Sequence, residues 1–227
     1  MLKIYEENDE KKLLLAKIND KYKFAINKNK ITNTDFLNMS EKVLAQNFLQ
    51  ENRITNYLFF GGNGENSDRN ILIFYPEKFL PEMVEKNYSK IASGIRITLP
   101  KNVSYEHKIY LSGILKLGVK REKVGDILVR EDGADIIVLN EIVEFLKNNL
   151  ENLTRFQSSK IEIIDVNNIK KQEKNFEDMK IIVSSMRIDN FVSELAHCSR
   201  TKALEILDEQ KVQINYNLET KSSKKIN

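Results

Sequence analysis

The sequence predicts an α+β fold of three successive modules, and three observations support this prediction. Apolar residues recur at helical spacing near the start of the chain. Between about residues 91 and 165, short apolar strands alternate with amphipathic helices. Beyond a polar, charge-rich stretch at residues 167–178, the pattern changes to two short helices flanked by strands. With 227 residues and 41% hydrophobic content, the chain can give each module a core.

The first module, residues 1–78, is expected to be an N-terminal α/β unit. A helix is predicted over about residues 9–25, where the apolar positions at helical spacing are Leu13, Leu14, Ile18, Tyr22 and Ala25. Ser40 is the expected N-cap of a second helix. Two strands, Tyr57–Phe60 and Ile71–Tyr75, are predicted to follow it.

The glycine-rich loop between these strands, Gly61-Gly62-Asn63-Gly64, is expected to be a hairpin turn. A phosphate-binding loop would continue with Gly-Lys-Ser or Gly-Lys-Thr, which this sequence lacks. The next acidic residues, Glu65 and Asp68, would repel a phosphate. A nucleotide-binding role is therefore not expected for this loop.

The second module, residues 79–166, has strands and helices in the order β-α-β-β-α-β. The expected strands are 94–99, 126–130, 135–139 and 160–164, and the expected helices are 105–117 and 141–150. This order is typical of a ferredoxin-like unit, with residues 131–134 turning the central hairpin. Domains of this topology that bind RNA stack bases on aromatic residues of the central strands. The candidate strand carries Ile136, Ile137 and Val138 instead, so base stacking is not expected.

Residues 167–180 are expected to form a linker and strand, and residues 181–227 a small third module. Within that module, Asp189 is the expected cap of a helix over residues 190–196. A plain capping role would fully explain its presence. Ser199 is the expected N-cap of the following helix.

Two cations stand in the first turn of that last helix, Arg200 and Lys202. The helix macrodipole disfavours cations there by a few tenths of a kcal/mol each. A bound anion would gain from the exposed amides and from both side chains, so the pattern predicts a phosphate site. The alternative is that both side chains are solvated surface residues.

The loop Gly118–Gly125 is a secondary candidate, because Lys120, Arg121 and Lys123 lie just beyond a predicted helix end. Gly118 can adopt the left-handed conformation that closes such a helix. A second phosphate contact is expected there. The alternative is that these cations only complement the negative end of the helix dipole.

The composition and the charge balance bear on nucleic-acid binding, on metal or catalytic sites, and on location. The 36 Lys and Arg nearly balance the 33 Asp and Glu, giving a net charge of +3, so any nucleic-acid signal must come from the placement of charges. Cys198 is the sole cysteine, and His107 and His197 lie far apart, so neither a metal site nor a catalytic centre is expected. The acidic start, Met1–Glu7, is unlike a signal peptide, and no apolar run approaches a membrane helix. A cytoplasmic location is expected.

Motifs distributed over most of the chain resemble the YlmH proteins. They are Phe59-Phe60-Gly61-Gly62, Tyr75-Pro76, His107-Lys108-Ile109-Tyr110-Leu111-Ser112-Gly113, Leu117-Gly118-Val119-Lys120-Arg121-Glu122-Lys123-Val124-Gly125-Asp126-Ile127 and Ser184-Ser185-Met186-Arg187-Ile188-Asp189. Within residues 181–227, the strings Met-Arg-Ile-Asp-Asn-Phe-Val, Ser-Arg-Thr-Lys-Ala and Lys-Val-Gln-Ile-Asn also resemble the S-four-type (alpha-L) RNA-binding domain.

The resemblance implies a bacterial, cytoplasmic RNA-binding protein with no enzymatic activity and no cofactor. It implies binding to structured ribosomal RNA or tRNA on the large ribosomal subunit, in translation or the rescue of stalled ribosomes, and a gene near cell-division genes. We expect a monomer with no membrane and no small-molecule partner. The expected RNA-binding residues are Arg187, Ser199, Arg200, Thr201, Lys202 and Lys211, with Lys120, Arg121 and Lys123 as a secondary set.

The chain departs from the family pattern in three places. His107-Lys108-Ile109 stands where the family usually has His-Arg-Asp, which removes a polar role at the third position. Gln210 replaces a glycine at the exit of the last helix. If the backbone needs a left-handed turn there, a Cβ costs roughly 1–2 kcal/mol. The sequence also ends at Asn227, before the basic final strands that the family pattern predicts, so the S-four-type module is expected to be incomplete.

Two other functions remain open. The same small domain is often attached to pseudouridine synthases, which makes an RNA-modifying enzyme an alternative. Those enzymes carry an Arg-Leu-Asp motif in a larger catalytic domain, whereas Arg187-Ile188-Asp189 lies inside the small module itself. The other alternative is an interaction protein in cell division whose RNA binding is vestigial.

Overall fold

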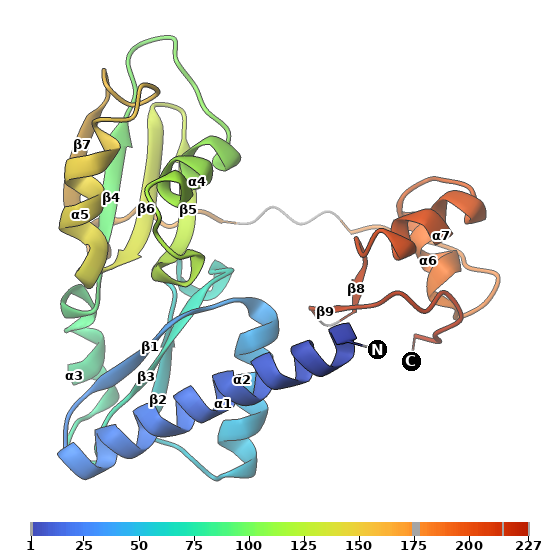
Figure 1. Cartoon of the computed structure of the whole chain (residues 1–227), viewed down its shortest axis with the longest axis horizontal. Coiled ribbons are helices and arrows are strands. Elements are labelled where there is room, and N and C mark those ends of the chain that lie inside the picture. The colour runs from blue at the N-terminus through green and yellow to red at the C-terminus, as the bar shows by residue number, and fades with distance from the viewer. Residues whose placement is uncertain (1, 174–177, 215, 227) are drawn as a thin grey trace. The chain divides into compact units, whose positions relative to one another are not determined.

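A computed structural model describes residues 2–173, 178–214 and 216–226 (Figure 1). It combines helices with antiparallel sheets, which confirms the predicted α+β class. The chain divides into two compact units, Met1–Glu173 and Lys174–Asn227.

The first unit begins with a three-stranded antiparallel sheet in the order β1-β3-β2. Its elements are α1 (Leu2–Lys28), β1 (Thr32–Leu37), α2 (Met39–Glu51), β2 (Tyr57–Phe60), the 3-10 turn η1 (Gly64–Asn66) and β3 (Asn70–Phe74). Both helices lie along this sheet (Figure 1). Ile18 and Ala25 of α1 and Leu49 of α2 pack against Leu72 and Phe74 of β3.

The prediction for these elements needs three corrections. The first helix is longer than residues 9–25, and β1 was not predicted. The N-cap of α2 is Asn38 and not Ser40. The Asn38 side chain accepts the backbone N–H of Glu41 at 2.9 Å, and the Glu41 carboxylate accepts the backbone N–H of Asn38 at 2.7 Å. This reciprocal capping box satisfies amides at the start of the helix, where helical partners are absent.

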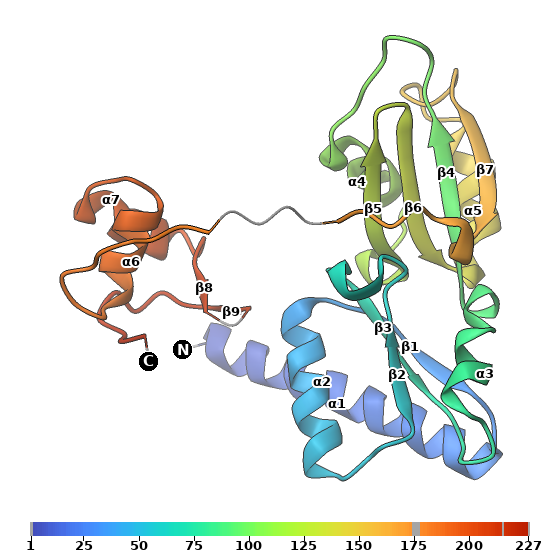
Figure 2. The same ribbon diagram turned by 180° about the vertical axis from the view of Figure 1, so that it is seen from behind.

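A four-stranded antiparallel sheet in the order β5-β6-β4-β7 forms the rest of the first unit. Its elements are α3 (Pro81–Glu85), η2 (Tyr88–Lys90), β4 (Ala92–Thr98), α4 (His107–Lys116), η3 (Arg121–Lys123), β5 (Val124–Arg130), β6 (Gly133–Leu139), α5 (Asn140–Leu150), β7 (Lys160–Asp165) and η4 (Val166–Asn168). Helices α4 and α5 cover one face of the sheet (Figure 2). Tyr110 and Leu146 from these helices pack against Ile95, Ile97 and Ile136.

Side chains from both sheets form a second core on the opposite face of the four-stranded sheet. It contains Phe36 and Ile73 from the first sheet and Leu128 and Ile137 from the second. The loop between β2 and β3 is fastened to β5, because the Asp126 carboxylate accepts two backbone N–H groups of that loop at 3.0 Å. This part of the sheet face is therefore closed by protein.

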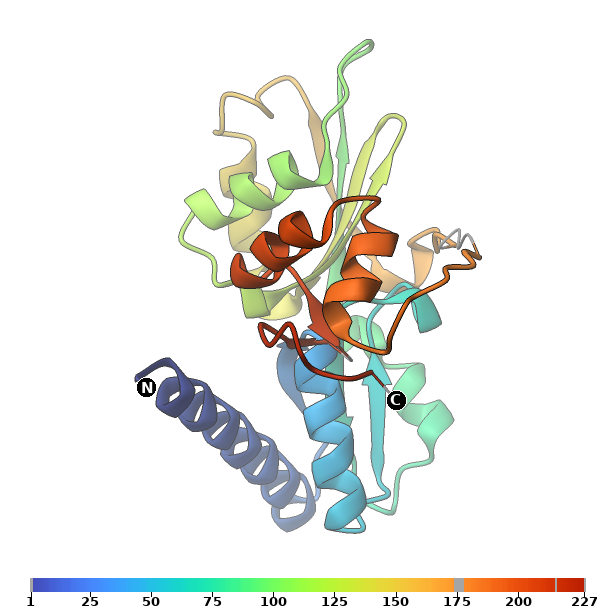
Figure 3. The same cartoon turned by 90° about the vertical axis from the view of Figure 1, so that its right-hand side faces the viewer.

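The second unit is a small helical module with a two-stranded ribbon. Its elements are α6 (Ile188–Leu195), α7 (Arg200–Asp208), β8 (Gln213–Ile214) and β9 (Asn217–Leu218). Figure 3 shows α6 and α7 side by side, and their small core contains Ile188, Val192, Ala203 and Leu207. The backbone N–H of Ile188 donates to the carbonyl of Lys224 at 2.9 Å, so the end of the described chain pairs with the start of α6.

Candidate nucleic-acid interface

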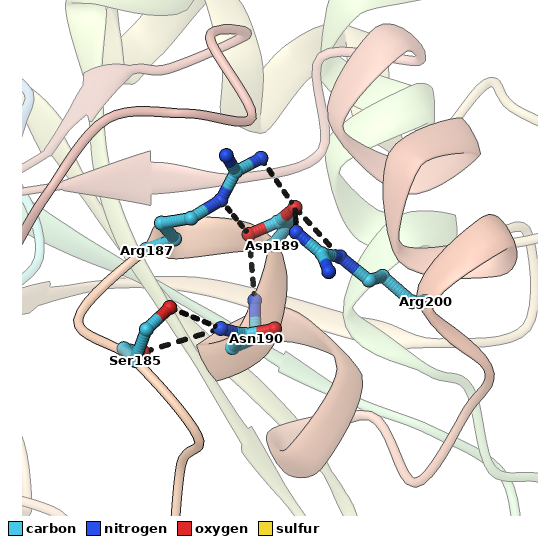
Figure 4. Close-up of polar contacts among 5 residues, drawn as sticks. All are labelled: Ser185, Arg187, Asp189, Asn190 and Arg200. Atoms are coloured by element: carbon cyan, nitrogen blue, oxygen red, sulfur yellow. Dashed lines mark hydrogen bonds and ion pairs between the residues drawn. The ribbon is translucent and has the colours of Figure 1, made fainter.

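One buried carboxylate, that of Asp189, holds two guanidinium groups at the start of α6 and α7 (Figure 4). Arg187 donates from Nε to Oδ1 at 3.0 Å and from Nη2 to Oδ2 at 2.8 Å. Arg200 donates from Nε and Nη2 to Oδ2 at 3.0 and 2.8 Å. The Asp189 side chain is 1% exposed, whereas those of Arg187 and Arg200 are 36% and 56% exposed. The arrangement therefore buries the anion and leaves the cations at the surface.

The local sequence explains how these three residues meet. Arg187 is the N-cap residue of α6 and Asp189 lies in its first turn, where the helix dipole favours an anion. The Asp189 carboxylate also accepts the backbone N–H of Asn190 at 3.1 Å. Arg200 is the first residue of α7, and the packing of α7 on α6 brings it to Asp189. The prediction that Asp189 is the helix cap was wrong, because α6 already begins at Ile188.

Within this Arg-Asp-Arg cluster (Arg187, Asp189 and Arg200), direct contacts between the charged groups shift pKa values. Hydrogen bonds from Arg187, and then from Arg200, lower the pKa of Asp189 to about 2 against the opposing effect of burial. The hydrogen bond to Asp189 raises the pKa of Arg187. The Asp189 carboxylate is thus charged at neutral pH, and with two guanidinium groups the cluster keeps one net positive charge.

The rest of the predicted primary site lies at both ends of α7. Ser199 is the N-cap, and its Oγ accepts the backbone N–H of Lys202 at 3.2 Å. The ammonium of Lys202 lies 2.6 Å from the Glu205 carboxylate, and that of Lys211 lies 2.5 Å from Glu209. Because these pairs are exposed, solvent screens them and each contributes little to stability.

These intramolecular partners are what reasoning from the sequence missed. Arg200 and Lys202 were expected to contact a phosphate, with solvated side chains as the alternative, yet each has a carboxylate partner within the protein. The signal for the second partner was present, since Glu205 stands three residues after Lys202 on one helix face. The first partner, Asp189, depends on how α6 and α7 pack and has no local signal.

The exit of α7 has the left-handed backbone that the family pattern suggested. Gln210 has φ 59°, where the family usually has glycine. The backbone N–H of Gln210 donates to the carbonyl of Leu207 at 2.9 Å, and that of Lys211 donates to Ile206 at 3.2 Å. This turn sets the direction of the chain from α7 into β8.

In the secondary set (Lys120, Arg121 and Lys123), Arg121 and Lys123 already have partners within the first unit. Arg121 donates to the carbonyls of Val124 and Gly125 at 2.5 and 3.3 Å, and burial lowers its pKa to about 10. The ammonium of Lys123 lies 2.6 Å from both Asp35 and Glu141. Lys120 is exposed.

A second Arg-Asp-Arg arrangement lies on the four-stranded sheet. Asp135 of β6 is 1% exposed and accepts hydrogen bonds from Arg96 of β4 at 2.8 and 2.7 Å. Arg130 of β5 also donates to it. By strand alternation, these side chains share the sheet face that carries Leu128 and Ile137. Sequence reasoning did not single them out.

Neither histidine belongs to a metal-binding cluster. Within the described ranges, no group of three or more His, Cys, Asp or Glu side chains is placed to hold a metal ion. Burial and nearby Arg121 lower the pKa of His107. Among the helices described, none is long and apolar enough to cross a membrane.

Parts of the chain are similar to known proteins. Residues 84–171 match the family model described as "Putative RNA-binding domain in YlmH". Over 183 residues, the chain is 27% identical to "Ribosome-associated protein quality control protein P2" of Bacillus subtilis (strain 168), covering 81% of this chain and 69% of the relative. A solved structure, "Cell division protein ylmH from Streptococcus pneumoniae", is 18% identical with a TM-score of 0.49, covering 72% of this chain and 92% of the other.

Residues 84–171 are thus similar to a domain described as RNA-binding, and neither this model nor the name of the relative indicates an enzyme family. The chain is similar to YlmH proteins over these residues. The matched residues contain the Arg96, Arg130 and Asp135 cluster and the secondary set at Lys120, Arg121 and Lys123, whereas the cluster around Asp189 lies outside them.

Proposed function

We propose that this protein binds structured ribosomal RNA or tRNA on the large ribosomal subunit, without catalysing a reaction. The role would be in translation or the rescue of stalled ribosomes. The name of the Bacillus subtilis relative, a ribosome-associated quality control protein, supports this setting. The match to a family model described as RNA-binding supports RNA as the ligand. The protein would act in the cytoplasm as a monomer and without a cofactor.

The observation that carries the proposal is the pair of surface guanidinium groups at the entrance of α7. Arg187 and Arg200 are held by one carboxylate, with Nη1 of each outside that interaction. The helix dipole and the first amides of α7 favour an anion at the same place. Charged hydrogen bonds to a phosphate are stronger than neutral ones. Ser199, Thr201, Lys202 and Lys211 would complete the contact.

The domain organisation follows from the same proposal. An N-terminal unit, residues 1–78, would support a ferredoxin-like RNA-binding domain at 79–166. Residues 167–180 would link it to the S-four-type module at 181–227. In the ferredoxin-like domain, bases would not stack on the centre of the sheet, because Leu128 and Ile137 are buried under the N-terminal sheet. Exposed Lys120 would contribute a secondary phosphate contact, with Arg121 and Lys123 shaping its loop.

Sedimentation with purified bacterial large ribosomal subunits, and binding to a tRNA transcript, test the proposal across a KCl series. Arg200→Ala and Lys202→Ala should each weaken binding and lower the logarithmic salt slope by about 1 for each phosphate that the variant no longer neutralises. Lys180→Ala, an exposed lysine of the same unit outside the site, is the matched control and should leave the slope unchanged. Unaltered binding of both site variants to both RNAs would refute the assignment.

A further inference from the structure

The Asp189 carboxylate puts a negative charge inside a site that should attract phosphate. Its side chain is 1% exposed, and it accepts from Nε and Nη2 of both Arg187 and Arg200. A guanidinium carries five N–H donors in a fixed planar fork. Each arginine therefore keeps donors for another partner, and Figure 4 shows the two forks meeting at one carboxylate from opposite sides.

We propose that Asp189 is a positioning residue for RNA binding, which fixes Arg187 and Arg200 as one two-pronged phosphate clamp. The inference rests on the proposed function and deepens it. An arginine that is free to rotate loses rotamer entropy when a ligand orders it, and Asp189 has already ordered both side chains. Preorganisation of this kind strengthens binding by lowering the cost of ordering. Asp189 therefore fixes the orientation of the two guanidinium groups, but it lowers the positive charge of the site by one unit.

A purely electrostatic role for these residues makes the opposite prediction. Removing a carboxylate from a phosphate-binding surface makes that surface more positive and should strengthen binding. Glu205 provides the matched comparison, because it is also a carboxylate that pairs with a site cation, Lys202, in the same unit. It is exposed and touches the flexible ammonium of a lysine, so it has no rigid fork to position.

The experiment compares Asp189→Asn with Glu205→Gln in the full chain. Each variant removes one negative charge with little change of shape. The probes are purified bacterial large ribosomal subunits and a tRNA transcript over a KCl series. Asp189→Asn should bind both probes roughly tenfold more weakly, with the salt slope nearly unchanged because every cation of the site is still present. Glu205→Gln should bind as tightly as the parent protein or more tightly.

Arg187→Lys guards against a loss of folding in Asp189→Asn. This variant keeps the charge of the site but cannot make the two-point contact with Asp189. It should bind several-fold more weakly, with circular dichroism and thermal unfolding close to those of the parent protein. A structural defect alone would alter unfolding and leave the affinity of the folded fraction unchanged.

The outcomes distinguish the positioning role of Asp189 from RNA binding at the site itself. Tighter or equal binding by Asp189→Asn, or equal binding by Arg187→Lys, overturns the positioning role while Arg200→Ala still weakens binding. Undiminished binding by both Arg200→Ala and Lys202→Ala would refute the proposed RNA-binding site itself. Opposite signs for Asp189→Asn and Glu205→Gln would support the clamp.

Discussion

Gly62 packs on Ile137 so closely that a Cβ on Gly62 would lie 2.5 Å from Cδ1 of Ile137. Gly62 belongs to the loop between β2 and β3, and Ile137 lies in the middle of β6. Gly125 meets Phe36 in a similar way, with a Cβ position 2.6 Å from Cε1 of that ring. The N-terminal sheet thus seals the part of the four-stranded sheet where RNA-recognition domains stack bases. Bases could therefore not stack on that part of the sheet.

Gly62→Ala should destabilise the first unit more than a change of backbone strain alone can explain. Gly62 has φ 85°, so any residue with a Cβ costs about 1–2 kcal/mol there. The added methyl group must also displace the side chain of Ile137. Gly118→Ala is the control, because Gly118 has φ 80° and open space around its Cβ position. Urea denaturation should show the larger loss of unfolding free energy for Gly62→Ala, and equal losses would contradict the close packing.

The fold class and most elements were predictable because they depend on periodicity within short segments. The strands and helices between residues 92 and 165 lie close to their predicted positions for this reason. Strand β1 escaped prediction because Thr32–Leu37 is largely polar. Its burial comes from pairing with β3, more than thirty residues later in the chain. No local pattern reveals such a contact.

In the candidate site too, features within one segment were predictable, whereas contacts between helices were not. Ser199 as the cap of α7, and Arg200 and Lys202 in its first turn, follow from spacing along one segment. The bond between Asp189 and Arg200 joins residues eleven positions apart on two helices and needs the packed structure. A buried aspartate beside exposed arginines is visible only once burial is known.

Acid should weaken the second unit within a pH window set by Asp189. Arg187 and then Arg200 lower the pKa of Asp189 from the usual 3.8 to about 2 in the folded protein. Because the folded pKa is depressed, the stabilisation is complete above the unfolded value and is lost as pH falls from about 4 to about 2. Hydrogen exchange of the α6 and α7 amides over this range measures the loss. Asp189→Asn should lose this part of the pH dependence, and a full dependence in that variant would contradict the assignment.

Gln210→Gly should stabilise the second unit. Gln210 has φ 59°, a left-handed conformation that costs a residue with a Cβ about 1–2 kcal/mol. Glycine removes that cost but loses about 0.5–1 kcal/mol through the greater entropy of its unfolded chain. The expected net gain in unfolding free energy is therefore up to about 1.5 kcal/mol, with a central value of about 0.8 kcal/mol. Gln210→Ala is the control, because alanine keeps the Cβ and should give no comparable gain. Slower hydrogen exchange of the α7 amides in Gln210→Gly alone is the expected result, whereas equal protection in both variants would show that backbone strain at this turn is not what limits the unit.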